Sequence, residues 1–251
     1  MLTKPDHNVS RLITVHAAFG AGLSFAHSLR ARGFRRTMLF VALGHAVPIL
    51  GEYSATNLLK LLRHGTHPQI KGVPLAIALG WYNVSYATFA MMESLLNRVK
   101  VDEPSQISVL PPLTAVVATS LDLLLDPFGL DLGLWKWTSD GAYATEIEGP
   151  NGKLGVPLLN FAGWLGLTTS VTLAYQRLSS DQEVMRRLPP GAAGSPEAGR
   201  RAAFLLLPYY LPAMAWALRR KRRLKYLLYS CPFSVALWAA LRSADRLLRV
   251  F

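Results

Sequence analysis

The segment QISVLPPLTAVVATSLDLLLDP, residues 106–127, is a long apolar run that ends in two carboxylates four residues apart, Asp122 and Asp126. A run of about 20 apolar residues is long enough to cross the hydrocarbon core of a bilayer as a helix. Carboxylates at membrane depth are energetically expensive, so they are candidates for a functional site. Aromatic residues and an amide follow, as far as Trp164, and lead directly into another apolar run.

The composition extends this interpretation to the whole chain of 251 residues, which is 51% hydrophobic and only 17% charged. Charged residues make up about a quarter of an ordinary soluble domain. We therefore predict an all-α fold, a polytopic transmembrane bundle of about seven helices that forms one domain over residues 1–251. Residues 1–10 are a polar N-terminus, and residues 189–199 are a flexible loop by composition. The predicted segments are 11–28, 37–52, 73–92, 106–125, 154–175, 202–218 and 226–241.

The net charge of +12 would suggest nucleic acid as a partner if the protein were soluble. The basic residues instead cluster beside apolar segments, at 30–36 and 219–225. Cytoplasmic loops and anionic lipid headgroups explain that pattern, so membrane lipid is the expected partner and nucleic acid is not. The single cysteine, Cys231, excludes an intrachain disulfide and a cysteine metal site. His64 and His67 have no third ligand beside them, so no metal is expected.

Orientation follows from lysine and arginine in short loops. The loop 30–36 is expected in the cytoplasm, and the more acidic loop 126–153 on the opposite side. The basic run 219–225 is also expected at the cytoplasmic headgroups, which conflicts with a simple alternation of crossings. Either segment 202–218 re-enters without crossing, or one segment is misplaced.

Alternate helix ends share a membrane face, so Glu52, the two aspartates and Asn160 should lie together. Asp122 and Asp126 are one helical turn apart and share a face, and Pro127 should end their helix at Asp126. A carboxyl group at the negative end of a helix, buried among apolar side chains, is favoured in its protonated form. A general acid needs that form, and the same reasoning applies to Glu52.

Simpler interpretations remain open for these residues. Each carboxylate could cap a helix end or pair with a basic residue near the interface. The aromatic residues could belong to the belt of Trp and Tyr found at membrane interfaces, or their ring faces could line a hydrocarbon pocket and stabilise positive charge. This applies to Trp135, Trp137, Tyr143 and Trp164.

Several short patterns together resemble the integral-membrane carotenoid biosynthesis proteins that include the carotenoid 1,2-hydratases of the bisanhydrobacterioruberin hydratase and gamma-carotene hydroxylase type. They are Asp122-x-x-x-Asp126-Pro127, Trp135-x-Trp137, Gly141-x-Tyr143 and Gly155-Val-Pro157-x-x-Asn160-Phe161-x-Gly163-Trp164. Lys71-Gly-Val-Pro-Leu75 with Trp81 resembles the start of that family's third helix, and Glu52 takes the place of an acid near the end of its second.

The resemblance runs from about Pro48 to Thr169, with departures in two places. Residues 57–67 stand where the family has a Gly-rich, Tyr-containing stretch, and Ala144 to Leu154 form an insertion. Both changes fall on the expected substrate side, so the fold follows from the resemblance more directly than the substrate does.

The resemblance implies an enzyme, a hydro-lyase that adds water to a terminal isoprene double bond of a carotenoid or related prenyl chain through a tertiary carbocation. It implies no cofactor, and an integral protein of a bacterial or archaeal cell membrane. Asp126 or Asp122 would be the acid, Glu52 its partner or a base that orients water, and Asn160 a polar positioning residue. The hydrocarbon would contact Trp81, Trp135, Trp137, Tyr143, Phe161 and Trp164.

Two other functions fit the same residues. If an alkene of the substrate captured the cation in place of water, the protein would be a membrane-embedded terpenoid cyclase. If no proton were transferred, it would be a non-enzymatic carotenoid- or lipid-binding membrane protein.

Overall fold

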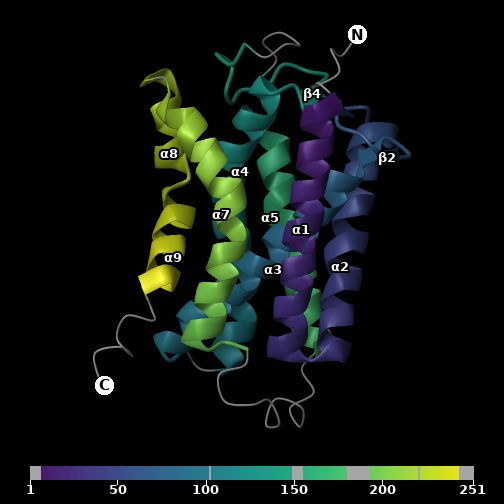
Figure 1. The fold of residues 1–251 in the computed structure, drawn as a ribbon. Coiled ribbons are helices and arrows are strands. Elements are labelled where there is room, and N and C mark those ends of the chain that lie inside the picture. The colour runs from purple at the N-terminus through teal and green to yellow at the C-terminus, as the bar shows by residue number, and fades with distance from the viewer. Residues whose placement is uncertain (1–6, 102, 149–154, 180–192, 220, 243–251) are drawn as a thin grey trace.

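Long helices lying side by side make up the computed structural model, which describes residues 7–101, 103–148, 155–179, 193–219 and 221–242 (Figure 1). The all-α fold is confirmed. The long helices are α1 (His7–Arg32), α2 (Phe34–Tyr53), α3 (Leu75–Arg98), α4 (Glu103–Asp131), α5 (Leu158–Ser179) and α7 (Pro196–Leu218). The short helices α8 (Leu224–Tyr229) and α9 (Cys231–Arg242) follow. Four strands lie in the connections, β1 (Leu62–His64), β2 (Gln69–Ile70), β3 (Val73–Pro74) and β4 (Trp135–Trp137).

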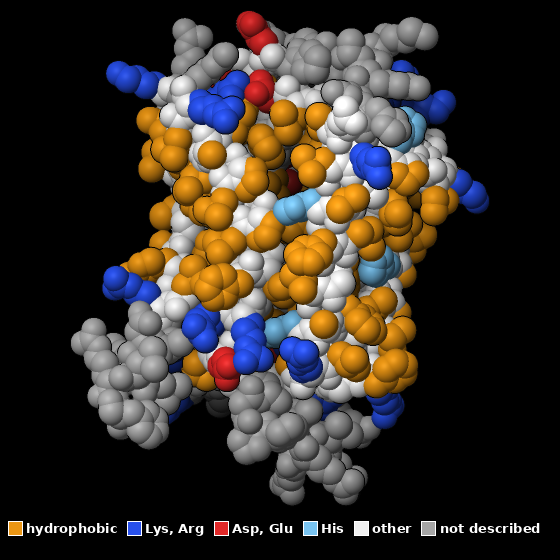
Figure 2. Space-filling model, viewed as in Figure 1, with side chains coloured by type: hydrophobic (Ala, Val, Ile, Leu, Met, Phe, Trp, Pro, Cys, Tyr) orange, Lys and Arg blue, Asp and Glu red, His pale blue; other side chains and the backbone are white. Residues whose placement is uncertain are grey.

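Three helices in the described ranges are long and apolar enough to cross a membrane, at Asn8–Arg32, Phe34–Leu58 and Ser105–Asp131. The helix α3 is the most buried and packs against α1, α2, α4 and α7. Large apolar side chains are exposed on the outer helices, including Phe19, Leu50 and Leu211. Figure 2 shows hydrophobic side chains over the middle of one face, with Lys and Arg mostly toward the two ends. This distribution suits a protein surrounded by lipid.

The bundle has two different ends. At the hairpin end, α1 and α2 meet at Gly33, whose φ of 77° is easily reached only by glycine. At the strand end, β1 pairs with β4 beside the ends of α2 and α4 and the start of α5 (Figure 1). This ribbon is antiparallel and aligns Leu62 with Trp137 and His64 with Trp135.

Helix α7 runs from the hairpin end to the strand end, so the re-entrant alternative for segment 202–218 is wrong. Near its start, the Ala193 N–H donates to the Ala31 carbonyl at 3.1 Å. Near its other end, the Trp216 indole N–H donates to Asp131 at 2.7 Å. The helix therefore crosses the bundle despite its internal prolines, Pro208 and Pro212.

The basic runs 30–36 and 219–225 consequently lie at opposite ends, and the prediction that both face the cytoplasm is wrong. The physical reason is local pairing. Arg223 binds Asp131 at 3.0 Å, and Lys225 binds Glu146 at 2.9 Å. An acid at the end of α4 and one in the α4–α5 connection thus neutralise part of the second run. The segment predicted at 226–241 is also divided, because α8 ends before Ser230.

Helix α4 does not end at Asp126 as predicted, and continues through Pro127 to Asp131. A proline has no N–H, so the carbonyl four residues earlier loses its helical partner. That carbonyl belongs to Leu123, and it accepts a hydrogen bond from the Tyr143 hydroxyl at 2.5 Å. The loop after α4 thus satisfies the carbonyl that Pro127 leaves free, and the helix can continue past the proline.

Candidate active site at the strand end

Two buried carboxyl groups share one amide at the strand end. Asp122 and Asp126 are 5% and 2% exposed. The Nδ2 atom of Asn160, in the first turn of α5, donates to Asp122 Oδ2 at 2.9 Å and to Asp126 Oδ2 at 2.7 Å. The structure therefore places these three residues in direct contact, as the alternation of helix ends predicts. Among the described residues, no lysine, arginine or histidine forms an ion pair with either aspartate.

The second oxygen of Asp126 accepts a hydrogen bond from the Trp135 indole N–H. Trp135 reaches back over the last turns of α4 because Gly129 has no side chain. A Cβ atom at that position would lie 2.1 Å from the indole ring. Trp137 is two residues further along the strand, so it lies on the same side of the ribbon. Its buried Nε1 atom lies close enough to Asp126 to act on that carboxyl as a second indole donor, although it has no partner within hydrogen-bond distance among the described residues.

Glu52 lies on the same site from the end of α2. Its carboxylate accepts a hydrogen bond from the Trp81 indole N–H at 2.9 Å, and its other oxygen lies 3.2 Å from His64 Nε2. His64 stands opposite Trp135 in the ribbon, and residues directly opposite in an antiparallel pair project to the same side. Glu52 is thereby linked to Asp126 through His64 and Trp135, and its charge acts electrostatically on both aspartates.

Aromatic rings line this group of carboxyls on several sides. Trp81 stacks on Trp164 with ring centroids 3.8 Å apart. Tyr143 meets Phe161 edge to face at 5.0 Å. Burial, followed by the nearby negative charge of Asp122, raises the pKa of Tyr143. Tyr143 therefore keeps its proton and donates it in the hydrogen bond to α4. In Figure 2, an acidic side chain is visible between hydrophobic ones in a hollow of the surface.

His64 is the residue of this site that sequence reasoning missed, because it was considered only as a metal ligand with His67. In the structure it pairs with Glu52, and its side chain is 2% exposed. Only the alignment of β1 with β4 brings it there, and that alignment has no clear signal in the sequence. In the described part of the chain, no group of three His, Cys, Asp or Glu residues could hold a metal ion.

Comparison with known proteins identifies the family of this chain. Neither the curated proteins nor the solved structures that were searched include a match. The family model described as carotenoid biosynthesis protein matches residues 13–192, which include every site residue described above. The chain therefore belongs to the carotenoid biosynthesis protein family, and it is a membrane protein with a role in carotenoid biosynthesis.

Proposed function

We propose that this protein adds water to a terminal isoprene double bond of a carotenoid or related prenyl chain, in a bacterial or archaeal cell membrane. The observation that carries the proposal is the pair of buried aspartates that Asn160 bridges, with no basic partner among the residues that the structure describes. Like charges buried together are costly, so such a pair is favoured when it holds one proton between its members. One member can then act as an acid while the other acts as a base.

The proton balance of hydration suits such a pair. One carboxyl, Asp126 or Asp122, gives its proton to the less substituted carbon of the alkene and leaves a tertiary carbocation. Water then forms a bond to that cation through its oxygen. The other carboxylate takes the proton that this water loses. The pair begins and ends with one proton, and the net change is the addition of one water molecule.

The surroundings support each part of this reaction. The ring faces of Trp81 and Trp164 can stabilise the positive charge of the intermediate, as can the charge of Glu52. Asn160 holds the two aspartates in one geometry. The buried Nε1 of Trp137 faces Asp126 as a further donor beside the carboxyl pair. The resemblance to the carotenoid 1,2-hydratases favours water over an alkene of the substrate as the group that captures the cation.

The test is product analysis in a host that makes an acyclic carotenoid, with and without this protein. A hydratase gives a product heavier by one water, and growth in water enriched in heavy oxygen places that isotope in the new hydroxyl group. A product of unchanged mass with an additional ring would instead assign the cyclase function. Pigment that binds the purified protein and is recovered unchanged would assign the non-enzymatic binding function.

A further inference from the structure

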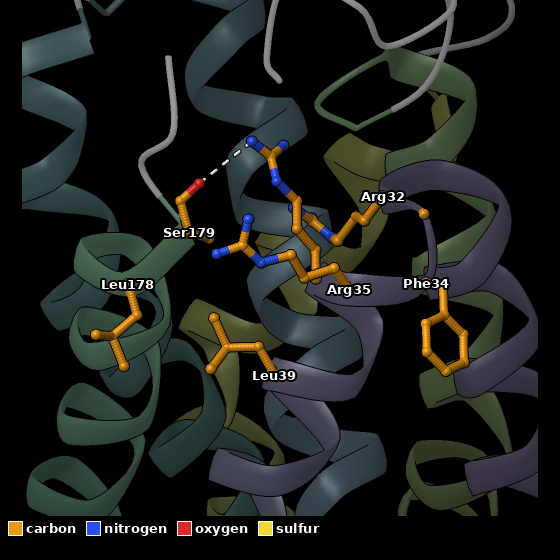
Figure 3. Close-up of a pocket in the computed structure, with 8 residues that line it drawn as sticks. Arg32, Phe34, Arg35, Leu39, Leu178 and Ser179 are labelled. Atoms are coloured by element: carbon orange, nitrogen blue, oxygen red, sulfur yellow. Dashed lines mark hydrogen bonds between the residues drawn. The ribbon is translucent and has the colours of Figure 1, made fainter. Parts of the chain in front are cut away.

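A second site lies at the hairpin end, far from the aspartates along the bundle. A cavity of about 200 Å³ opens where the end of α1, the start of α2 and the end of α5 meet (Figure 3). Its wall includes the arginines Arg32, Arg35 and Arg36 and the residues Leu39, Leu178 and Ser179. Figure 3 shows the arginine side chains gathered beside Ser179, with Leu39 and Leu178 next to them.

Two of these arginines are held inside the protein. Arg32 is 5% exposed and binds Glu93 through both terminal nitrogens, at 3.2 and 2.6 Å. Its Nε atom is buried and has no hydrogen-bond partner among the described residues. Arg36 is 7% exposed and donates to the Ser179 carbonyl at 3.2 Å. Arg35 is exposed at the mouth of the cavity. The charge of Arg32 is balanced by Glu93, but its unused Nε donor and the two further arginines in the wall are suited to an anion.

The backbone adds to this positive field. Helix α2 begins at the cavity, and its N-cap, Gly33, provides no side-chain hydrogen bond. The first turn of the helix contains no acidic residue. The positive end of the helix dipole and its first N–H groups are therefore not neutralised by a side chain of that turn. An anion in the cavity would be stabilised by both.

The apolar surroundings of the cavity indicate which class of anion it suits. Phe34 and Leu178 are 67% and 64% exposed on the outer surface beside the arginines. Helices α1 and α2, which meet here, are both candidate membrane spans. The cavity is also smaller than the ~300 Å³ of a usual small-molecule pocket, so it suits a headgroup and not a whole ligand. A free phosphate would make no use of the apolar surface next to the cavity.

We propose that this cavity binds the phosphate of an anionic phospholipid, whose acyl chains lie along the exposed apolar surface of α2 and α5. Such a lipid would fix the relative positions of the three helix ends that form the site. The site is independent of the reaction at the strand end.

The proposal can be tested by native mass spectrometry of the full-length protein in detergent. Phosphatidylglycerol and phosphatidylcholine with identical acyl chains are added separately, and soluble glycerol phosphate is added as a competitor. Phosphatidylglycerol should be retained preferentially, and glycerol phosphate should not displace it. The double variant Arg35→Gln/Arg36→Gln should weaken retention roughly thirtyfold, if each charge contributes as much as a basic residue near an anionic surface. The control is the double variant Arg219→Gln/Lys221→Gln, which removes the same charge from exposed positions at the other end. It should not weaken retention of phosphatidylglycerol.

Because Arg36 is buried, Arg35→Glu provides a second variant at an exposed position, and it should also weaken retention. Equal retention of both phospholipids would overturn the proposal. Equal losses in the two double variants would do the same, because they would show that only total charge matters. Displacement by glycerol phosphate would assign the cavity to a soluble anion.

Discussion

The two ends of the bundle both bury ionisable side chains, but they do so by opposite means. At the hairpin end, Arg32 is neutralised by Glu93, and its guanidinium carbon lies 5.0 Å from the centre of the Phe89 ring. At the strand end, Asp122 and Asp126 are buried against each other, and an amide and an indole are their hydrogen-bond partners. The first arrangement joins opposite charges, whereas the second brings together groups of the same sign.

The two pairs suit different uses. The pair of opposite charges can hold helices together, whereas the pair of acids suits the reaction that we propose. A buried charge that has an opposite partner is tolerated in the interior and can fix how helices pack. Two acids of the same sign gain nothing from burial together, so their position has to be explained by something other than stability. The proton transfer that we propose would explain it, because a buried acid and base must lie within reach of one reacting atom.

The largest expected effect is on catalysis. Asp126→Asn keeps the shape of the side chain but removes the transferable proton, and should lower the rate of product formation roughly 10²–10⁴-fold. Asp122→Asn should cost less if that residue mainly holds the second charge. The double variant should cost far less than the product of the two effects, since the pair acts as a unit. Initial rates in membranes, normalised to folded protein, measure this. Full activity in both single variants would leave the carboxylates as structural residues.

Next in size is the effect of breaking the ion pair at the hairpin end. Glu93→Gln leaves the buried Arg32 charge without its partner, and should lower the free energy of unfolding by about 3–5 kcal/mol. Replacing both residues, Arg32→Met with Glu93→Leu, should cost much less. Unfolding in detergent measures each difference. The comparison sharpens with Asp126→Asn, which should cost clearly less stability than Glu93→Gln, because it loses one accepted hydrogen bond but leaves no buried charge without an opposite partner. A large loss of stability in Asp126→Asn would remove the distinction between the two ends.

A smaller effect is expected where the loop fastens to α4. Tyr143→Phe removes the donor to the Leu123 carbonyl, and leaving a buried acceptor unpaired costs about 1–3 kcal/mol. When Pro127→Ala is also present, the restored N–H can donate to the Leu123 carbonyl, so Tyr143→Phe should lower the free energy of unfolding by less. Unfolding measurements on the four variants of this cycle give the coupling. An equal cost in both backgrounds would show that Tyr143 acts through its ring contacts alone.

The smallest effect concerns an exposed pair at the strand end. Burial alone would raise the pKa of Glu146, but hydrogen bonds from Tyr226 and Lys225 outweigh it, so the pKa is lowered. A lowered pKa means that the stability contributed by Glu146 is present above its ordinary pKa of about 4.3 and is lost as the pH falls below it. Glu146→Gln should abolish that part of the acid sensitivity, an effect of less than about 1 kcal/mol for such an exposed pair. Identical acid titrations of stability in the variant and the parent would contradict this.

Much of the fold could be predicted from the apolar runs, because each long run of such residues can satisfy its backbone only as a helix in lipid. The end of α4 could not be predicted. The helix continues past Pro127 because Tyr143, sixteen positions further along the chain, donates to the carbonyl that the proline leaves free. The strands were also missed, as short pairs depend on tertiary alignment more than on local preference.

Part of the candidate site could also be predicted from the sequence, and part could not. Asp122, Asp126 and Asn160 lie at alternate helix ends, so topology alone predicts that they meet, although their catalytic role stays a prediction. The position of His64 could not be found, because it follows from the alignment of β1 with β4. The two basic runs were assigned to one face because a count of positive charges ignores the acids that pair with them.

The bridge between Tyr143 and Val156 has a consequence for how such a protein can diversify. The two residues exchange backbone hydrogen bonds at 3.1 and 2.6 Å, and Gly141 lets Val156 approach so closely that a Cβ there would meet its backbone at 2.1 Å. The segment between them is thus closed at its base. Lengthening such a closed segment adds little entropic cost, so the number of residues between Ile147 and Gly155 can change while Tyr143 and Asn160 stay in place. The group of residues at the strand end could in this way be inherited together with connections of different length.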